Sequence, residues 1–150
     1  MTPAVEAAKR AGIEFRLHEY TGVEHGDGDY AAAVAASLGR PPQQLFKTLL
    51  VTVDGTLSAF LVPADRQLDL RAAGKRAMLA DRARAERATG YAAGGISPLG
   101  QRKKLPTTVD ESALEWSTIF VSAGRRGLQI ELSPRDLVRL THARVAKVAR

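Results

Sequence analysis

Two apolar segments on either side of the pair Asp54-Gly55 constrain the fold of this chain most strongly. Phe46–Val53 and Leu57–Val62 each have the length and the β-branched content of a strand. Asp-Gly is a typical two-residue hairpin turn, because both of its positions tolerate a positive φ. The sequence therefore predicts a β-hairpin in the middle of a sheet.

A lysine interrupts the first of these strands. Strict alternation places Lys47 on the same face as Leu49, Val51 and Val53. An unpaired ammonium on a buried face costs on the order of several kcal/mol. Two interpretations are open: the aliphatic stem packs while the head reaches water, or the cation orients a carboxylate, a phosphate or an ester oxygen.

Capping residues and alternation place the remaining elements. Helices are expected at Pro3–Ala11 after Thr2, Tyr30–Leu38 after Asp29, Leu68–Lys75, Asp81–Ala88 and Pro134–Leu140. Further strands are expected at Ile13–Tyr20, Thr118–Ser122 and Leu128–Leu132, and a polar loop at Gly22–Gly28. Because strands and helices interleave irregularly, the predicted class is α+β with a mixed central sheet, in a single domain over residues 1–150.

The net charge of the chain indicates what kind of partner it binds. The 150 residues carry a formal net charge of +6, and 5% of them are aromatic. A basic surface favours a polyanion such as nucleic acid, whereas few aromatics argue against a base-stacking platform. There is no cysteine, which excludes disulfides, thiolate zinc sites and a protein thiol nucleophile. Neither a secretory signal nor a membrane-length apolar run is visible, so we expect a cytoplasmic protein without a membrane partner.

A glycine-rich segment, Gly90–Gly100, is the second candidate for chemistry. It is either an irregular connection whose glycines permit a positive φ, or a loop whose main-chain amides hold a carbonyl oxygen or a terminal ribose. Gly95 and Gly100 have the spacing of a P-loop. Gln101 and Arg102, however, stand where that motif needs lysine and serine or threonine, which argues against an NTPase.

Other polar residues have simpler interpretations. Thr48 and Ser122 have no adjacent histidine, so a serine-type triad is poorly supported. No metal site is expected, since metal-ligand spacing is missing from His18, His25 and His142. A short exposed helical turn is expected to contain Asp110, Glu111 and Glu115. Two interpretations are open for the basic residues: they are simply exposed to solvent, or they contact phosphates of a nucleic acid. These residues are Arg102, Lys103, Lys104, Arg125 and Arg126.

Together these segments resemble the YbaK family of free-standing aminoacyl-tRNA deacylases, which are related to the editing insertion of bacterial prolyl-tRNA synthetase. The likeness spans nearly the whole chain, and Gly94 and Pro98 meet the family's Gly-x-x-x-Pro loop pattern. The matching stretches are Phe46–Leu49, Leu68–Leu70, Ala88–Tyr91, Gly94–Gln101 and Val121–Leu128.

The resemblance implies a mixed, mostly antiparallel sheet curled into a partial barrel with flanking helices. It also implies editing in trans: removal of cysteine from tRNA(Pro), and from tRNA(Cys) as a further substrate, without a metal or cofactor. A second chemical check is needed because cysteine and proline are close in size, and a pocket discriminates a methylene-scale difference by only about 10–200-fold. The expected partners are the acceptor end of aminoacyl-tRNA and prolyl-tRNA synthetase, and not DNA.

In this family the substrate's own thiol is thought to attack the ester carbonyl. Carried over to this chain, Lys47 orients the tRNA terminus and the ester, and the main chain of Gly94–Gly100 holds the reacting carbonyl, with Gly100 as its catalytic member. The expected substrate contacts are Tyr20, Tyr30, Thr48, Gly94, Gly95, Ile96, Ser97, Pro98 and Ser122. The expected tRNA contacts are Arg102, Lys103, Lys104, Arg125 and Arg126.

The chain departs from the family pattern in three places. Leu68–Lys75 is shorter than usual, Gly22–Asp29 is unusually rich in glycine, and Gln129 stands where relatives often carry an acidic residue. Two alternatives to cysteine editing remain open. One is deacylation of another small aminoacyl-tRNA, such as Ala-tRNA(Pro), and the other is a non-catalytic module that binds tRNA or a synthetase.

Overall fold

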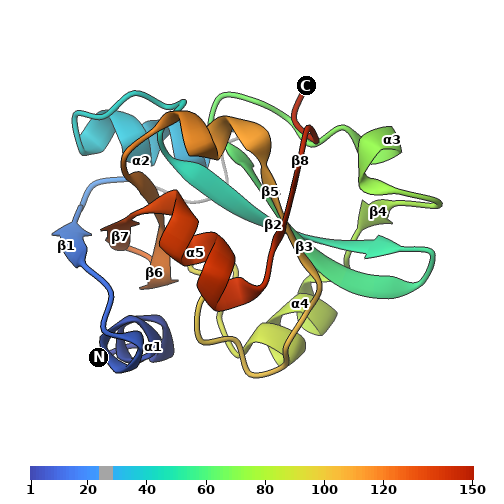
Figure 1. Cartoon of the computed structure of the whole chain (residues 1–150), viewed down its shortest axis with the longest axis horizontal. Coiled ribbons are helices and arrows are strands. Elements are labelled where there is room, and N and C mark those ends of the chain that lie inside the picture. The colour runs from blue at the N-terminus through green and yellow to red at the C-terminus, as the bar shows by residue number, and fades with distance from the viewer. Residues whose placement is uncertain (24–28) are drawn as a thin grey trace.

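The computed structural model describes residues 1–23 and 29–150, and it contains two sheets surrounded by short helices (Figure 1). The helices are α1 (Pro3–Ala11), α2 (Tyr30–Ser37), α3 (Leu70–Ala73), α4 (Arg82–Thr89), α5 (Pro134–Thr141) and the 3-10 helix η1 (Glu111–Glu115). The strands are β1 (Phe15–Glu19), β2 (Phe46–Val53), β3 (Thr56–Pro63), β4 (Met78–Leu79), β5 (Thr107–Asp110), β6 (Ile119–Arg125), β7 (Leu128–Leu132) and β8 (Arg144–Ala146).

The predicted hairpin lies at the centre of the larger sheet, whose order is β4-β2-β3-β5-β8. Strands β2 and β3 pair antiparallel over their full length, and Asp54 and Gly55 both have positive φ, as their turn requires. On the far side of β3, strands β5 and β8 continue the sheet in parallel. The hairpin prediction is therefore confirmed.

The smaller sheet is antiparallel and has the order β1-β7-β6. His18, Gln129 and Ser122 are aligned across its three strands, so their side chains lie on one face. The opposite face carries Val121 and Ile130, which are completely buried. One face of this sheet thus belongs to the core, and the other is free to carry polar groups.

The two sheets meet where β2 begins. Leu45 and Phe120 form an isolated parallel bridge between them, and the amide nitrogen of Phe120 lies 3.1 Å from the carbonyl oxygen of Gln44. The predicted α+β class with mostly antiparallel pairing is confirmed, and the strands form a mixed five-stranded sheet and a three-stranded sheet in contact with it. Over the described ranges, the strands do not close into a barrel.

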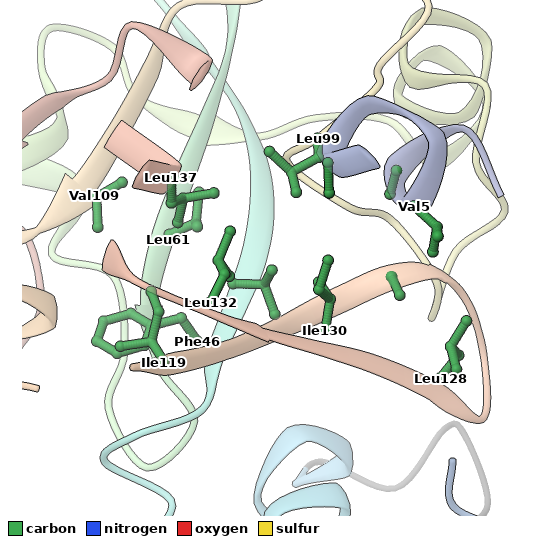
Figure 2. Close-up of a cluster of buried hydrophobic side chains, with 14 of the residues drawn as sticks. Val5, Phe46, Leu61, Leu99, Val109, Ile119, Leu128, Ile130, Leu132 and Leu137 are labelled. Carbon is green, nitrogen blue, oxygen red and sulfur yellow. The ribbon is translucent and has the colours of Figure 1, made fainter. Parts of the chain in front are cut away.

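The main core fills the space between the small sheet, α1, α5 and the start of the hairpin (Figure 2). Val5 reaches it from α1, Leu137 from α5 and Leu99 from the glycine-rich loop. Helix α1 has the predicted ends: Thr2 accepts a hydrogen bond from the amide of Val5, and Gly12 adopts a left-handed conformation. The core therefore anchors the loop that was predicted to carry chemistry.

Several predicted elements need correction. The helix expected at Leu68–Lys75 is limited to Leu70–Ala73, and Asp29 occupies the N-cap position of α2 without a capping hydrogen bond from its side chain. Strands β4, β5 and β8 were not predicted. Of the loop expected at Gly22–Gly28, residues 24–28, with His25, lie outside the described part of the chain.

The exposed turn predicted around Asp110 is wrong for that residue. Asp110 is only 4% exposed, and its Oδ1 accepts hydrogen bonds from the amides of Val148 and Ala149, each at 2.9 Å. Glu111 and Glu115 are exposed as expected. Among the helices of the described ranges, not one is both long and apolar enough to cross a membrane.

Candidate active site

A small cavity of about 160 Å³ lies between α2, the start of β2, the 93–96 loop and the polar face of the small sheet. Its apolar wall comes from Ala31, Val34, Leu45 and Phe46. Of the residues expected at the substrate, it is lined by Tyr30, Thr48, Gly94, Ile96 and Ser122. A cavity of about 150 Å³ holds benzene, so this one has room for a small aminoacyl group.

Two oxygen atoms at this cavity are buried without a hydrogen-bond partner. They are Oγ1 of Thr48 and Oε1 of Gln129, and both residues line the cavity. Gln129 is 5% exposed. Buried polar groups are nearly always paired in folded proteins, so an unpaired one calls for an explanation. Larger cavities occur elsewhere on the surface, but neither of these unpaired oxygens lines them.

The loop wall of the cavity is held from two sides at Ala93. The Ala93 amide donates to Oε2 of Glu86 at 2.7 Å, and its carbonyl oxygen accepts from Nε and Nη2 of Arg126 at 3.3 and 3.1 Å. This hydrogen bond from Ala93 is the main cause that lowers the pKa of Glu86 below its usual value. Arg126, expected to contact tRNA, thus also positions the loop.

Gly95 explains why the loop lies so close to the β6–β7 hairpin. A Cβ atom at this position would lie 2.7 Å from Cα of Arg125, which is closer than packed atoms approach. Only glycine fits without a shift of the main chain. Gly95 therefore contributes by close packing, while its neighbours Gly94 and Ile96 form the cavity surface.

The second half of the glycine-rich segment lies away from this cavity. Pro98 and Gly100 line a separate cavity of about 240 Å³ near α5. Gly100 has a positive φ, and a Cβ there would meet the carbonyl oxygen of Pro3 at 2.5 Å. Ser97 is fully buried, and its hydroxyl accepts from the amide of Leu99. The structure thus divides Gly94–Gly100 into a cavity wall and an anchor on α1.

Two tyrosines stand at the α2 side of the cavity. The hydroxyl oxygens of Tyr20 and Tyr30 lie 2.9 Å apart in a hydrogen bond, and Tyr30 lines the cavity. Burial, followed by this hydrogen bond, raises the pKa of Tyr30 well above its usual value. Tyr30 is therefore neutral at physiological pH and acts as a hydrogen-bonding group.

Lys47 occupies the opposite face of β2 from Thr48. It is partly buried, and it is not among the residues that line the cavity. Burial lowers its pKa, while the charges of Asp29 and Asp65 act in the opposite direction. Its neighbours Leu49, Val51 and Val53 pack in one apolar cluster, as the alternation predicted.

The basic run after the loop lies against the end of α4. The amides of Arg102 and Lys103 donate to the carbonyl oxygens of Thr89 and Ala88, both at 2.9 Å. Arg102, Lys103 and Lys104 are exposed, as are the α4 residues Arg82, Arg84 and Arg87. These two segments together form a basic surface next to the loop.

Some site residues were not found from the sequence. Glu86 lies in an ordinary Ala- and Arg-rich helix and gives no signal. Gln129 alternates with Leu128, Ile130 and Leu132, so the pattern places it on the polar face of its strand and gives no sign that it is 5% exposed. Across the described ranges, no group of three or more His, Asp or Glu side chains is placed to hold a metal ion.

Comparisons with known proteins identify the family of this chain. Residues 25–140 match the family described as the aminoacyl-tRNA editing domain. EbsC of Enterococcus faecalis, named for Cys-tRNA(Pro)/Cys-tRNA(Cys) deacylase activity, is 33% identical over 98% of this chain and 92% of its own length.

Solved structures share the fold. The hypothetical protein APE2540 is 30% identical with a TM-score of 0.86, and the match covers 99% of each chain. A protein described as a trans-editing enzyme for prolyl-tRNA synthetase is 24% identical with a TM-score of 0.85, over 100% of this chain and 99% of its own. The resemblance found in the sequence is confirmed, and the chain belongs to the aminoacyl-tRNA editing domain family.

Proposed function

We propose that this protein edits in trans by deacylating Cys-tRNA(Pro), with Cys-tRNA(Cys) as a further substrate. The cavity carries the proposal: its volume of about 160 Å³ suits a small aminoacyl group, and polar atoms of Thr48, Ser122 and Gln129 line it. The name of EbsC supports the same substrates.

The lining of the cavity favours attack by the substrate's own thiol. Among the described residues that line it, there is no histidine or carboxylate that would serve as a general base, and the chain has no cysteine. The substrate sulfur attacks the ester carbonyl carbon, the bond from that carbon to the ribose oxygen breaks, and the thiol proton passes to the departing oxygen. The products are free tRNA and a β-thiolactone, which water opens to cysteine.

The surrounding residues have separate roles in this proposal. The main chain at Gly94 and Ile96 faces the reacting ester, the Ser122 hydroxyl adds a hydrogen bond, and Tyr30 closes the α2 side. Lys47 orients the tRNA terminus from the edge of the site, which requires its long side chain to turn toward the bound ester. The basic surface of α4 and residues 102–104 meets acceptor-stem phosphates.

The partner and the setting follow from this chemistry. The substrate is the acceptor end of aminoacyl-tRNA, and prolyl-tRNA synthetase is the synthetase whose errors would be corrected. We propose that the protein acts in the cytoplasm, where charged tRNA is used. We also propose that residues 1–150 form a single editing domain.

The decisive experiment is a deacylation panel. Purified protein is mixed with tRNA(Pro) charged with cysteine, alanine, serine or proline, and with Cys-tRNA(Cys), with and without prolyl-tRNA synthetase. Rapid loss of cysteine, with serine and alanine nearly untouched, is the expected result. Equal rates for cysteine and serine would exclude thiol participation, since a hydroxyl is a far weaker nucleophile. Salt-sensitive tRNA binding without turnover of any ester would identify a binding module instead.

A further inference from the structure

The two unpaired oxygens at the cavity come from different sheets. Thr48 lies on β2 of the large sheet, and Gln129 lies on β7 of the small sheet. In the described part of the chain they are the only buried side-chain nitrogen or oxygen atoms without a hydrogen-bond partner, and both residues line the same cavity. Because both atoms lie at one cavity, we expect a bound ligand to supply the hydrogen bonds that they lack.

The chemistry of the two atoms restricts that ligand. The carbonyl oxygen of Gln129 can only accept a hydrogen bond, and the hydroxyl oxygen of Thr48 also has lone pairs to offer. The missing partner must therefore donate, and it must reach both walls of the cavity. A carboxylate, a phosphate or the ester carbonyl cannot do this, since none of them carries a donor.

An aminoacyl ester offers three donor groups. Its thiol is a weak donor, its ribose 2′-hydroxyl has a single proton to give, and its α-ammonium has three strong N–H donors. The ammonium can donate to both oxygens at once, whereas the 2′-hydroxyl can donate to only one of them and would have to accept from the Thr48 hydroxyl. We propose that Gln129 and Thr48 bind the α-ammonium of the aminoacyl group. This inference rests on the proposed function and adds the part of the substrate that the site selects.

A neutral acceptor suits such a place. Gln129 stands where relatives often carry an acid, and a carboxylate buried in an empty cavity would be costly to desolvate. The amide dipole selects an N–H donor without that penalty. In this proposal the chain therefore binds the amino group through hydrogen bonds to neutral acceptors rather than through an ion pair.

The test compares two substrates that differ only in the amine. Cysteinyl-tRNA(Pro) and 3-mercaptopropionyl-tRNA(Pro) share the thiol and the ester, but the second lacks the α-amino group. Wild-type protein should favour the cysteinyl ester in kcat/KM by on the order of tenfold to a hundredfold, the scale of hydrogen bonds to a charged group.

Variants assign that preference to the two residues. Gln129→Met and Thr48→Val remove the acceptors at nearly constant shape, and each should lower kcat/KM on the cysteinyl ester by a much larger factor than on the mercaptopropionyl ester. Gln129→Glu keeps an acceptor and should keep the preference. Gln43→Met and Thr52→Val are matched controls, because both residues bond elsewhere, to Asp65 and to the carbonyl oxygen of Met78. Melting temperatures at or above wild type exclude misfolding.

Two outcomes would overturn the assignment. Equal losses on both esters would mean that the oxygens serve the ribose or the fold, and unchanged rates would mean that they bind only water. Calorimetry with 3′-cysteinylamino-3′-deoxyadenosine and its desamino counterpart tests the same point without turnover. Tighter binding of the amine-bearing analogue is expected, and equal affinity refutes the inference. Failure of the proposed function is a different result: no aminoacyl-tRNA is hydrolysed at all.

Discussion

Oε2 of Glu86 lies 2.7 Å from the amide nitrogen of Ala93, so a carboxylate on α4 holds the loop that forms one wall of the cavity. From the opposite side, Nε and Nη2 of Arg126 donate hydrogen bonds to the carbonyl oxygen of the same residue. The peptide groups around Ala93 are thus fixed between two charged side chains of opposite sign. Rigid placement of a loop is what an active site needs when the main chain contacts the substrate.

Replacing Glu86 should impair catalysis more than folding. Glu86→Ala frees the Ala93 amide, and we expect kcat/KM on Cys-tRNA(Pro) to fall about tenfold with little change in melting temperature, since a misplaced site can cost up to about a hundredfold. Glu115→Ala, at an exposed position, is the control. NMR titration of Glu86 should give a pKa below the usual value near 4.3, so the hold on the loop is complete above that pH and is lost as the pH falls through the folded-state pKa. An ordinary pKa would contradict the contact.

Gly95→Ala should displace the loop by steric force. The new methyl would meet Cα of Arg125 at 2.7 Å, and the main chain must move to make room. Overpacking of this kind costs about 1–3 kcal/mol, and we expect the deacylation rate to fall at least tenfold. Gly55→Ala, in the distant hairpin turn, has open space but a positive φ. It should lose stability while keeping full kcat/KM, as measured by urea unfolding and by tRNA deacylation.

Removing the charge of Lys47 should abolish activity without harming the fold. Burial lowers the pKa of Lys47, so the unfolded chain holds its proton more tightly, and the charged form opposes folding at neutral pH. Lys47→Met keeps the stem and should melt at or above the wild-type temperature at pH 7, with deacylation reduced by about a hundredfold or more. Lys75→Met, at an exposed position, is the control. A variant with wild-type rates would remove Lys47 from the mechanism.

Asp110 should matter for stability and not for editing. Burial alone would raise its pKa, but hydrogen bonds from Ser112, Val148 and Ala149 together lower the pKa below its usual value. Asp110→Ala leaves the amides of Val148 and Ala149 without their partner, and we expect a loss of about 2–4 kcal/mol in the free energy of unfolding. Asp110→Asn keeps an acceptor and should lose less.

The effect of Asp110 should depend on pH in a defined direction. Because the folded-state pKa is depressed, the charged form adds stability above the unfolded value near 3.9, and this is lost as the pH falls through the folded-state pKa. The difference between wild type and Asp110→Asn in urea unfolding should therefore shrink below about pH 4. A constant difference would show that charge is not involved.

The basic surface should govern affinity rather than chemistry. Replacing Lys103 and Lys104 with alanine is expected to raise KM for charged tRNA and to leave kcat unchanged. The slope of log K against log salt should become shallower by about 0.7–0.9 for each phosphate that the protein no longer neutralises. The same double change at Arg71 and Lys75, on and after α3, removes equal charge from another part of the surface. Equal effects from both pairs would indicate a purely long-range attraction.

Local signals predicted the elements whose contacts are local. The cap at Thr2 and the turn at Asp54-Gly55 act within a few residues, and the structure has the expected helix and hairpin. Strands β5 and β8 are short, and their partners are distant in the chain, so no local pattern identifies them. Asp110 was misjudged for the same reason, because its partners lie nearly forty residues further on.

The site was predictable in its residue types but less so in its arrangement. Thr48, Gly94 and Ser122 do line one cavity, whereas Gly100 and Lys47 face other surroundings. A run of glycines looks like one loop in the sequence, yet packing against α1 at one end and against the β6–β7 hairpin at the other splits it in two. Such packing is decided by the tertiary fold. The roles proposed for these residues stay predictions until the variants are measured.

The cavity's walls come from both sheets, and its lining residues extend along the sequence from Tyr30 to Gln129. During synthesis on the ribosome, this cavity therefore cannot form until strand β7 has emerged and packed against the rest of the fold, so a chain released before that point has no such cavity.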